Sequence, residues 1–125
     1  MDRFRFDAES AFTPRDERLV RVTIAPLSPR LAEGSPVQAA VFRLAPGGRI
    51  ARHPADVPQI LAVLDGSGEV SGSSGAAEPI AAGEAVFWAE GEEHETTTSV
   101  GLTALIIEGP GLEPQSTTRL PGPAR

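Results

Sequence analysis

Turn-forming residues recur along almost the whole chain, and they limit the folds open to it. The sequence has 13 Gly and 12 Pro among 125 residues, without a three-residue period. The backbone must therefore reverse often, which disfavours a helical bundle and excludes a collagen helix. A chain of this length has room for one compact domain, and its 30 Leu, Ile, Val and Phe residues are enough for a single modest core.

Short apolar runs between these turn signals predict β-strands. The runs cover residues 19–24, 37–44, 59–64, 69–71, 85–88, 93–99 and 102–107. They end at Gly-rich or Pro-rich clusters, of which 46–48, 65–68 and 72–75 are the clearest. Such spacing, with almost no helical periodicity, is typical of an antiparallel sandwich or barrel. One short helix is expected between Ala8 and Arg18, with Thr13 as its N-cap and Pro14 in its first turn.

The charges are unevenly placed and exclude several classes of function. Residues 1–52 carry nine Arg and six acids, residues 53–118 carry eleven acids and no Arg or Lys, and two Arg follow. A continuous basic surface for nucleic acid therefore has nowhere to form. The chain lacks a signal peptide and any apolar run of membrane-spanning length, so we expect a soluble cytoplasmic protein without a membrane partner. The absence of Cys excludes disulfides, thiolate metal sites and Cys nucleophiles.

The only two histidines, His53 and His94, lie in two segments whose spacing resembles that of the cupin family. The first cupin motif maps onto Gly47, His53, Ala55, Gln59 and Gly66, and the second onto Gly83, Ala89, Gly91, His94 and Thr98. All spacings are kept across about half of the chain. The resemblance implies an all-β double-stranded β-helix, also called a jelly-roll barrel.

The resemblance also implies a metal site, with four departures from the family pattern. Ala55 replaces the second His of the first motif and Gln59 replaces its Glu, while Ala89 and Thr98 replace a Pro and an Asn at turns. The implied ligands are therefore His53, Gln59 and His94, a neutral set of nitrogen and oxygen donors. This set suits a divalent transition metal such as Fe, Mn, Ni, Cu or Zn.

Strand alternation adds neighbours to these three residues. Side chains two apart on a strand share a face, so the predicted pocket also contains Ala55, Leu61, Thr96 and Thr98. Glu93 and Glu95 should then point outward as a solvated acidic rim. Without a metal, the histidines and Gln59 would bond to each other, to Thr96 or to trapped water, so a metal-free polar pocket stays open as the alternative.

These observations predict three segments: an N-terminal segment of residues 1–18, a barrel of residues 19–108 and an irregular tail of residues 109–125. The alternating Phe4-Arg5-Phe6 sequence could act as an arm in a homodimer. The expected function is that of a small cupin that binds or acts on a small organic molecule, as a dioxygenase, isomerase or lyase would. The alternative is a non-catalytic binding or sensing barrel. Absence of Tyr disfavours a metal-free epimerase-like reaction.

Overall fold

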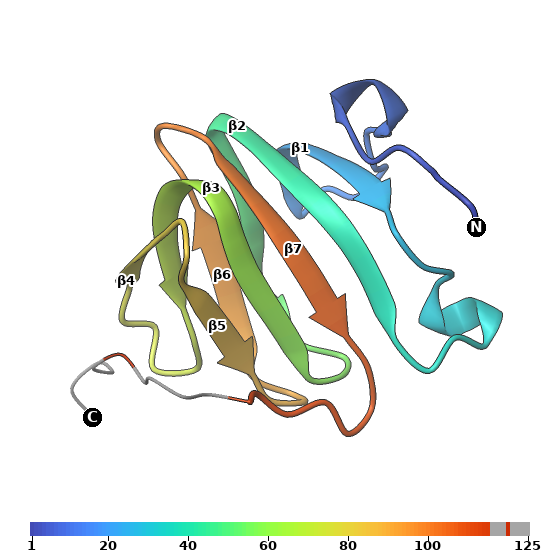
Figure 1. The fold of residues 1–125 in the computed structure, drawn as a ribbon. Coiled ribbons are helices and arrows are strands. Elements are labelled where there is room, and N and C mark those ends of the chain that lie inside the picture. The colour runs from blue at the N-terminus through green and yellow to red at the C-terminus, as the bar shows by residue number, and fades with distance from the viewer. Residues whose placement is uncertain (116–119, 121–125) are drawn as a thin grey trace.

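A computed structural model describes residues 1–115 and Leu120, and it has the predicted all-β jelly-roll barrel (Figure 1). Two single-turn 3₁₀ helices lie outside the barrel, η1 (Ala8–Ser10) and η2 (Leu31–Glu33). The strands are β1 (Leu19–Pro26), β2 (Gln38–Pro54), β3 (Gln59–Ser71), β4 (Glu78–Ala81), β5 (Ala85–Trp88), β6 (Glu93–Thr97) and β7 (Leu102–Glu108).

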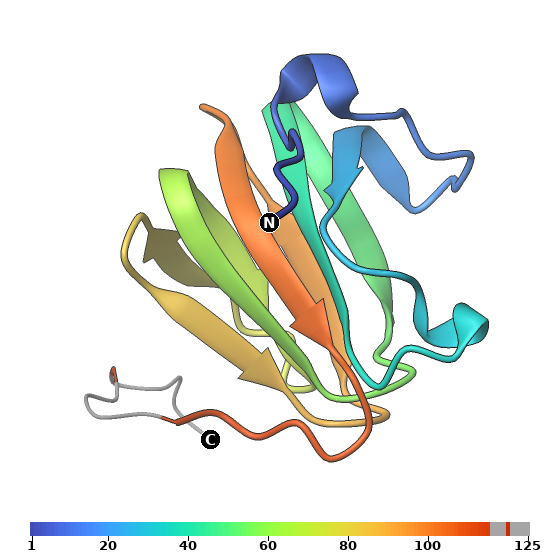
Figure 2. The same cartoon turned by 45° about the vertical axis from the view of Figure 1, so that its right-hand side comes forward.

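Two long strands, β2 and β3, take part in both layers of the barrel. Their first halves pair with β7, which lies between them, and β1 and β5 flank this layer in the order β1-β2-β7-β3-β5. Their second halves pair with β6, and β4 adds to β3, in the order β2-β6-β3-β4. All of these pairs are antiparallel, and Figures 1 and 2 show β7 in front of β6. Strands that change sheets in this way close a barrel without a separate connection.

Two predicted turns, at residues 46–48 and 65–68, are wrong because the strands bend there and continue. Strand β2 runs through the first cluster to Pro54, and β3 runs through the second to Ser71. The glycines allow close approach of neighbouring backbone: a Cβ at Gly66 would lie 2.2 Å from the carbonyl oxygen of Gly101, and one at Gly68 2.3 Å from that of Thr97. Glycine in a strand therefore marks a bend with a tight contact here, not a reversal.

The predicted helix near residue 14 is also wrong. The helical turn lies earlier, at Ala8–Ser10, where the Asp7 side chain accepts the Ser10 N–H at 3.1 Å. Phe12 then forms an isolated antiparallel bridge with Ile24, which holds the following residues extended. Residues 116–119 and 121–125 of the predicted tail lie outside the described residues. No helix among the described residues is long and apolar enough to cross a membrane.

The core fills the space between the two layers. It is built from inward-facing side chains of six of the strands: Val22, Leu44, Ile50, Leu61, Val63, Val70, Ile80, Trp88, Leu102, Ala104 and Ile106. Leu61 and Ala104 are almost fully buried, at 1% and 0% exposure. Because β2 and β3 pass through both layers, they contribute to the core and also carry residues of the first motif.

We predict that Gly68→Ala destabilises the protein much more than Gly75→Ala. The new methyl group at position 68 would collide with the Thr97 carbonyl, whereas position 75 has φ +78° but no atom within 4 Å. The expected losses of unfolding free energy are about 3 kcal/mol or more at position 68 and about 1 kcal/mol at position 75. Urea unfolding measures both. Equal losses would contradict the close-approach role of Gly68.

Candidate functional site

The structure brings the two histidines together. His53 near the end of β2 lies directly opposite His94 of β6 in the antiparallel register. Their Nε2 atoms are 3.1 Å apart, and their rings meet edge to face with centroids 4.4 Å apart. His94 is buried at 3% exposure, while His53 is half-buried. The imidazoles of the two motifs therefore lie together, as the motif spacing predicts.

Hydrogen bonding fixes which nitrogen of His53 carries its proton. Its Nδ1 lies 2.7 Å from the carbonyl oxygen of Ala51, and a carbonyl can only accept. A neutral His53 therefore holds its proton on Nδ1 and points the lone pair of Nε2 toward His94. Without an ion, His94 can donate from Nε2 to that lone pair. Its own Nδ1 is buried and has no hydrogen-bond partner among the described residues.

The environment of His94 keeps it neutral. The pKa of His94 is lowered from 6.5 to about 4. Burial is the largest cause, and the positive charges of His53 and Arg52 add to it. The indole of Trp88 also lies edge to face against it, with ring centroids 4.5 Å apart. An imidazole that is neutral at physiological pH can offer a lone pair to a proton or a metal ion.

The third predicted ligand, Gln59, has a strong partner elsewhere. Its Nε2 donates to Glu108 Oε2 at 2.9 Å, and Gln38 Nε2 donates to the other oxygen at 3.0 Å. Gln38 in turn accepts the backbone N–H of Leu31, so the network ties strands β2, β3 and β7 to η2. No hydrogen bond joins Gln59 to either histidine among the described residues. Its carbonyl oxygen accepts no hydrogen bond there, so Gln59 stays a predicted ligand through that atom.

The four predicted pocket residues are buried, and none of them lines the two best-formed cavities of the described residues. Ala55, Leu61, Thr96 and Thr98 have exposures of 4%, 1%, 2% and 6%. The hydroxyl of Thr98 donates to the Ser67 carbonyl and accepts the Gly101 N–H, so it holds the bend between β6 and β7. Glu93 and Glu95 alternate with the buried residues of β6, as expected for an outer rim.

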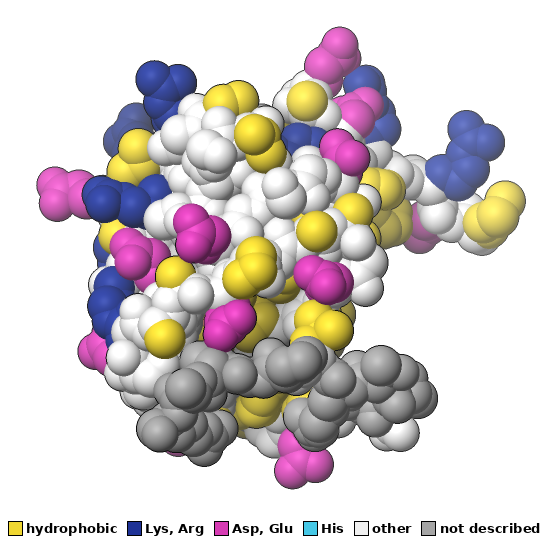
Figure 3. Space-filling model, turned by 90° about the vertical axis from the view of Figure 1, so that its left-hand side faces the viewer, with side chains coloured by type: hydrophobic (Ala, Val, Ile, Leu, Met, Phe, Trp, Pro, Cys, Tyr) yellow, Lys and Arg dark blue, Asp and Glu magenta, His cyan; other side chains and the backbone are white. Residues whose placement is uncertain are grey.

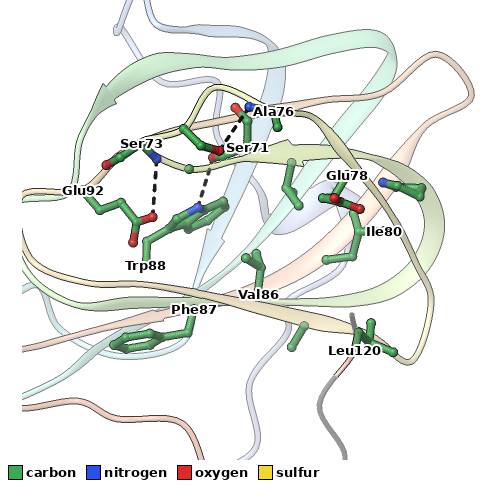
Figure 4. A pocket seen from close by; sticks show the side chains of 15 residues that line it. Ser71, Ser73, Ala76, Glu78, Ile80, Val86, Phe87, Trp88, Glu92 and Leu120 are labelled. Atoms are coloured by element: carbon green, nitrogen blue, oxygen red, sulfur yellow. Dashed lines mark hydrogen bonds between the residues drawn. The ribbon is translucent and has the colours of Figure 1, made fainter. Parts of the chain in front are cut away.

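A cavity of about 610 Å³ opens instead between β4 and β5, and sequence reasoning missed it. Figure 4 shows Ile80 of β4 and Val86 and Trp88 of β5 beside it, and Val70 of β3 also contributes. The space exists because β4 and β5 both pair with β3 but not with each other. The alternation of Val86 and Trp88 was the only sequence signal that these side chains share a face. The cavity itself results from the unpaired edges of β4 and β5, which the sequence does not indicate.

Polar groups surround the mouth of this cavity. Among the described residues, the charged ones that line it are Glu78 and Glu92, and Figure 3 shows acidic side chains around hydrophobic ones on one face of the molecule. The Trp88 indole N–H donates to the Ser71 carbonyl at 3.1 Å, and this bond fixes the ring between the cavity and His94. Arg52 donates to Ser71 Oγ and the Gly72 carbonyl at the rim.

Comparison with solved structures identifies the arrangement of strands. The chain resembles a cupin-like protein from Thermotoga maritima (19% identity, TM-score 0.71, covering 82% of this chain and 80% of the other). A cupin 2 conserved barrel domain protein from Salinispora arenicola matches with 20% identity and a TM-score of 0.62, covering 80% of this chain and 88% of the other. The chain has the cupin fold. Polyketide cyclase RemF from Streptomyces resistomycificus shares this barrel, with 23% identity and a TM-score of 0.74 over 86% of this chain and 78% of the other. No family model and no curated protein matches the chain.

The cupin barrel explains the spacing of the motif residues. Gly47, Gly66, Gly83 and Gly91 all have positive φ, so the motif glycines mark bends and turns of the barrel. The two histidines occupy facing positions on paired strands, whereas Ala55 offers no ligand atom. Among the described residues, no group of three or more His, Cys, Asp or Glu side chains converges. The polar centre of this barrel is therefore an imidazole pair.

We predict that the metal-free protein loses stability as the pH falls from about 7 to 4.5. The folded-state pKa of His94, about 4, lies below its ordinary value of 6.5, so the unfolded chain binds a proton more readily. The contribution of His94 to the free energy of unfolding is fully present above pH 6.5. It falls by up to about 3 kcal/mol as the pH approaches 4.

Urea unfolding of chelator-treated wild type and His94→Gln across this range measures the contribution. The difference in unfolding free energy between the two proteins should shrink toward low pH. A difference that stays constant would contradict a neutral, buried His94.

Proposed function

We propose that this cupin barrel binds a divalent transition-metal ion through His53 and His94 and binds a small organic molecule in the adjoining cavity. The observation that carries the proposal is the convergence of two Nε2 atoms at 3.1 Å, with His53 Nδ1 already committed to Ala51. A carbonyl partner on the other ring nitrogen is the usual way in which a protein orients a metal-binding histidine.

The imidazole pair fits an ion as two of its ligands. Nitrogen ligands bind such ions at about 2.1 Å, and two of them at 90–110° to each other lie about 3.0–3.4 Å apart. The observed separation falls in this range. Gln59 is the predicted third ligand, through the oxygen that its bond to Glu108 leaves free. The remaining positions would be open to water or to a bound molecule.

The chain's own residues define what such a site can do. A bound ion would supply Lewis acidity, or a site for oxygen chemistry in the case of a redox-active metal. His94 is held neutral by burial, so it can keep a lone pair available below neutral pH. Trp88 contacts both His94 and the cavity, so a molecule in the cavity lies against the indole. We propose a dioxygenase-, isomerase- or lyase-like role on this basis.

Metal binding should quench the fluorescence of Trp88, the only Trp in the chain. Cu²⁺, Ni²⁺ or Co²⁺ at the imidazole pair would lie close to an indole whose ring centroid is 4.5 Å from that of His94. We expect saturable quenching in the wild type that a chelator reverses, and an affinity about 100-fold lower in His53→Ala.

Glu95→Gln is the control for this titration, because Glu95 points outward beside His94 on β6. It should bind metal as the wild type does. The same affinity in His53→Ala and wild type would contradict a site at the pair. Loss of affinity in Gln59→Ala would place the Gln59 oxygen among the ligands.

A non-catalytic binding barrel is the second candidate, and the Gln59–Glu108 bond favours it. With that amide engaged, one hydrogen bond between the imidazoles can satisfy their two Nε2 atoms without an ion. In this case the cavity between β4 and β5 is the functional part. Its volume is in the range of small-molecule sites, and its wall is mostly apolar.

The cavity should prefer neutral aromatic molecules to anionic ones, because the charged residues that line it among those described are both glutamates. We expect 2-naphthol to bind more tightly than 2-naphthoate, by about 10-fold, and to change Trp88 fluorescence. Val86→Phe fills part of the cavity and should weaken binding, whereas Val100→Phe, at a residue 66% exposed outside it, should not. Equal binding of both probes, or no effect of Val86→Phe, would contradict this site.

A further inference from the structure

A row of three polar side chains crosses one layer of the barrel at its end. Gln38 of β2 and Gln59 of β3 are the register partners of Glu108, one on each side of β7. Leu61 of β3 and Ile106 of β7 lie two residues away, opposite each other, and belong to the core. Side chains two apart on a strand share a face, so the polar row lies on the inner face of this layer.

The imidazole pair lies at the same end of the barrel. Strands β5 and β7 end there and β6 begins there, as the arrows in Figure 1 show. Trp88 connects the two sets of residues. It is the register partner of Gln59, and its indole centroid lies 4.5 Å from that of the His94 ring. Gln59 and His94 are therefore both neighbours of one indole.

The carboxylate of Glu108 fixes the orientation of the Gln59 amide. A carboxylate accepts hydrogen bonds and cannot donate them, so the amide nitrogen of Gln59 must face Glu108, 2.9 Å from Oε2. The other carboxylate oxygen accepts the amide N–H of Gln38 at 3.0 Å. The amide oxygen of Gln59 is thereby turned away from Glu108, and it accepts no hydrogen bond from any described residue.

The negative charge of Glu108 has no positive partner among the described residues. The acids of the ion pairs found there are Asp7, Glu9, Asp16 and Glu33. Residues 53–118 contain no Arg or Lys. Both hydrogen-bond partners of the Glu108 carboxylate are neutral amides, and its side chain is half-buried. A half-buried carboxylate that is balanced only by amide dipoles favours a cation nearby.

We propose that Glu108 is a positioning residue of the metal site and acts through Gln59. This inference rests on the proposed function, because it concerns the ion that the imidazole pair would bind. By accepting the amide N–H, the carboxylate shifts electron density toward the amide oxygen of Gln59, which makes that oxygen a better ligand for a cation. The three predicted ligands are neutral, so Glu108 also supplies the negative charge that this set lacks.

The arrangement divides between two strands what one residue could provide. The cupin pattern has Glu at position 59, where this chain has Gln. Here the charge lies at the facing register position on β7, and a hydrogen bond connects it to the amide that carries the ligand oxygen. Gln59 and Glu108 together therefore have the oxygen ligand and the charge of a single Glu.

Co²⁺ titrations of the full chain, followed by Trp88 fluorescence, test this role. Glu108→Gln keeps the shape of the side chain and can still accept the Gln59 N–H, but it carries no charge. We expect its affinity for Co²⁺ to be lower than that of the wild type by about 10-fold or more. The matched control is Gln38→Ala, which removes the hydrogen bond to the other carboxylate oxygen and should change the affinity by no more than about 2-fold.

Two further variants separate positioning through Gln59 from a structural effect. In a Gln59→Ala background, adding Glu108→Gln should change the affinity by no more than about 2-fold, because a residue that acts through Gln59 has no effect without it. The exchanged variant, Gln59→Glu with Glu108→Gln, should bind Co²⁺ at least as tightly as the wild type. It places the carboxylate on the ligand itself and lets the amide at position 108 donate to it.

Circular dichroism establishes that each variant is folded. Wild-type affinity in Glu108→Gln would overturn the inference, and so would a loss of the same size in the Gln59→Ala background. An exchanged variant that binds no better than Glu108→Gln would overturn it too. Failure of the proposed function gives a different result, because His53→Ala would then bind Co²⁺ as tightly as the wild type.

Discussion

The bends of β2 and β3 hold the molecule together, because these strands pair with β7 in one layer and with β6 in the other. The bend in β3 depends on backbone contacts that leave no space for a side chain, with the Gly101 and Thr97 carbonyls in the positions that a Cβ on Gly66 or Gly68 would take. Both the core and the polar centre follow from these crossings. If the strands ended at their glycines, the barrel would open and the histidines would not meet.

The imidazole pair is a direct product of this arrangement. The second half of β2 pairs with β6 and sets His53 opposite His94, while β5 pairs with the first half of β3 and sets Trp88 against His94. Burial then keeps His94 neutral, and the Ala51 carbonyl orients His53. The pair comes from β2 and β6, the indole comes from β5, and the cavity beside the indole lies between β4 and β5.

The sequence predicted the parts that depend on local pattern and spacing. Alternation placed His94 and Thr96 inward and Glu93 and Glu95 outward, and the motif spacing predicted the barrel and the convergence of its histidines. The sequence could not predict contacts between residues that are far apart in the chain. Glycine clusters have the same local signal in a turn and in a bent strand, and only the neighbouring carbonyls distinguish them. The Gln59–Glu108 bond joins residues 49 positions apart, and the cavity arises from the unpaired edges of β4 and β5.

The central claim is that the two facing imidazoles are a metal site rather than a hydrogen-bonded pair. Anomalous X-ray diffraction from crystals grown with Co²⁺ or Ni²⁺ tests it most directly, because the signal locates the ion itself. We expect one strong peak within bonding distance of Nε2 of both His53 and His94. A fully ordered pair still in hydrogen-bond contact, with metal only at surface carboxylates, would contradict the claim and leave the cavity as the functional site.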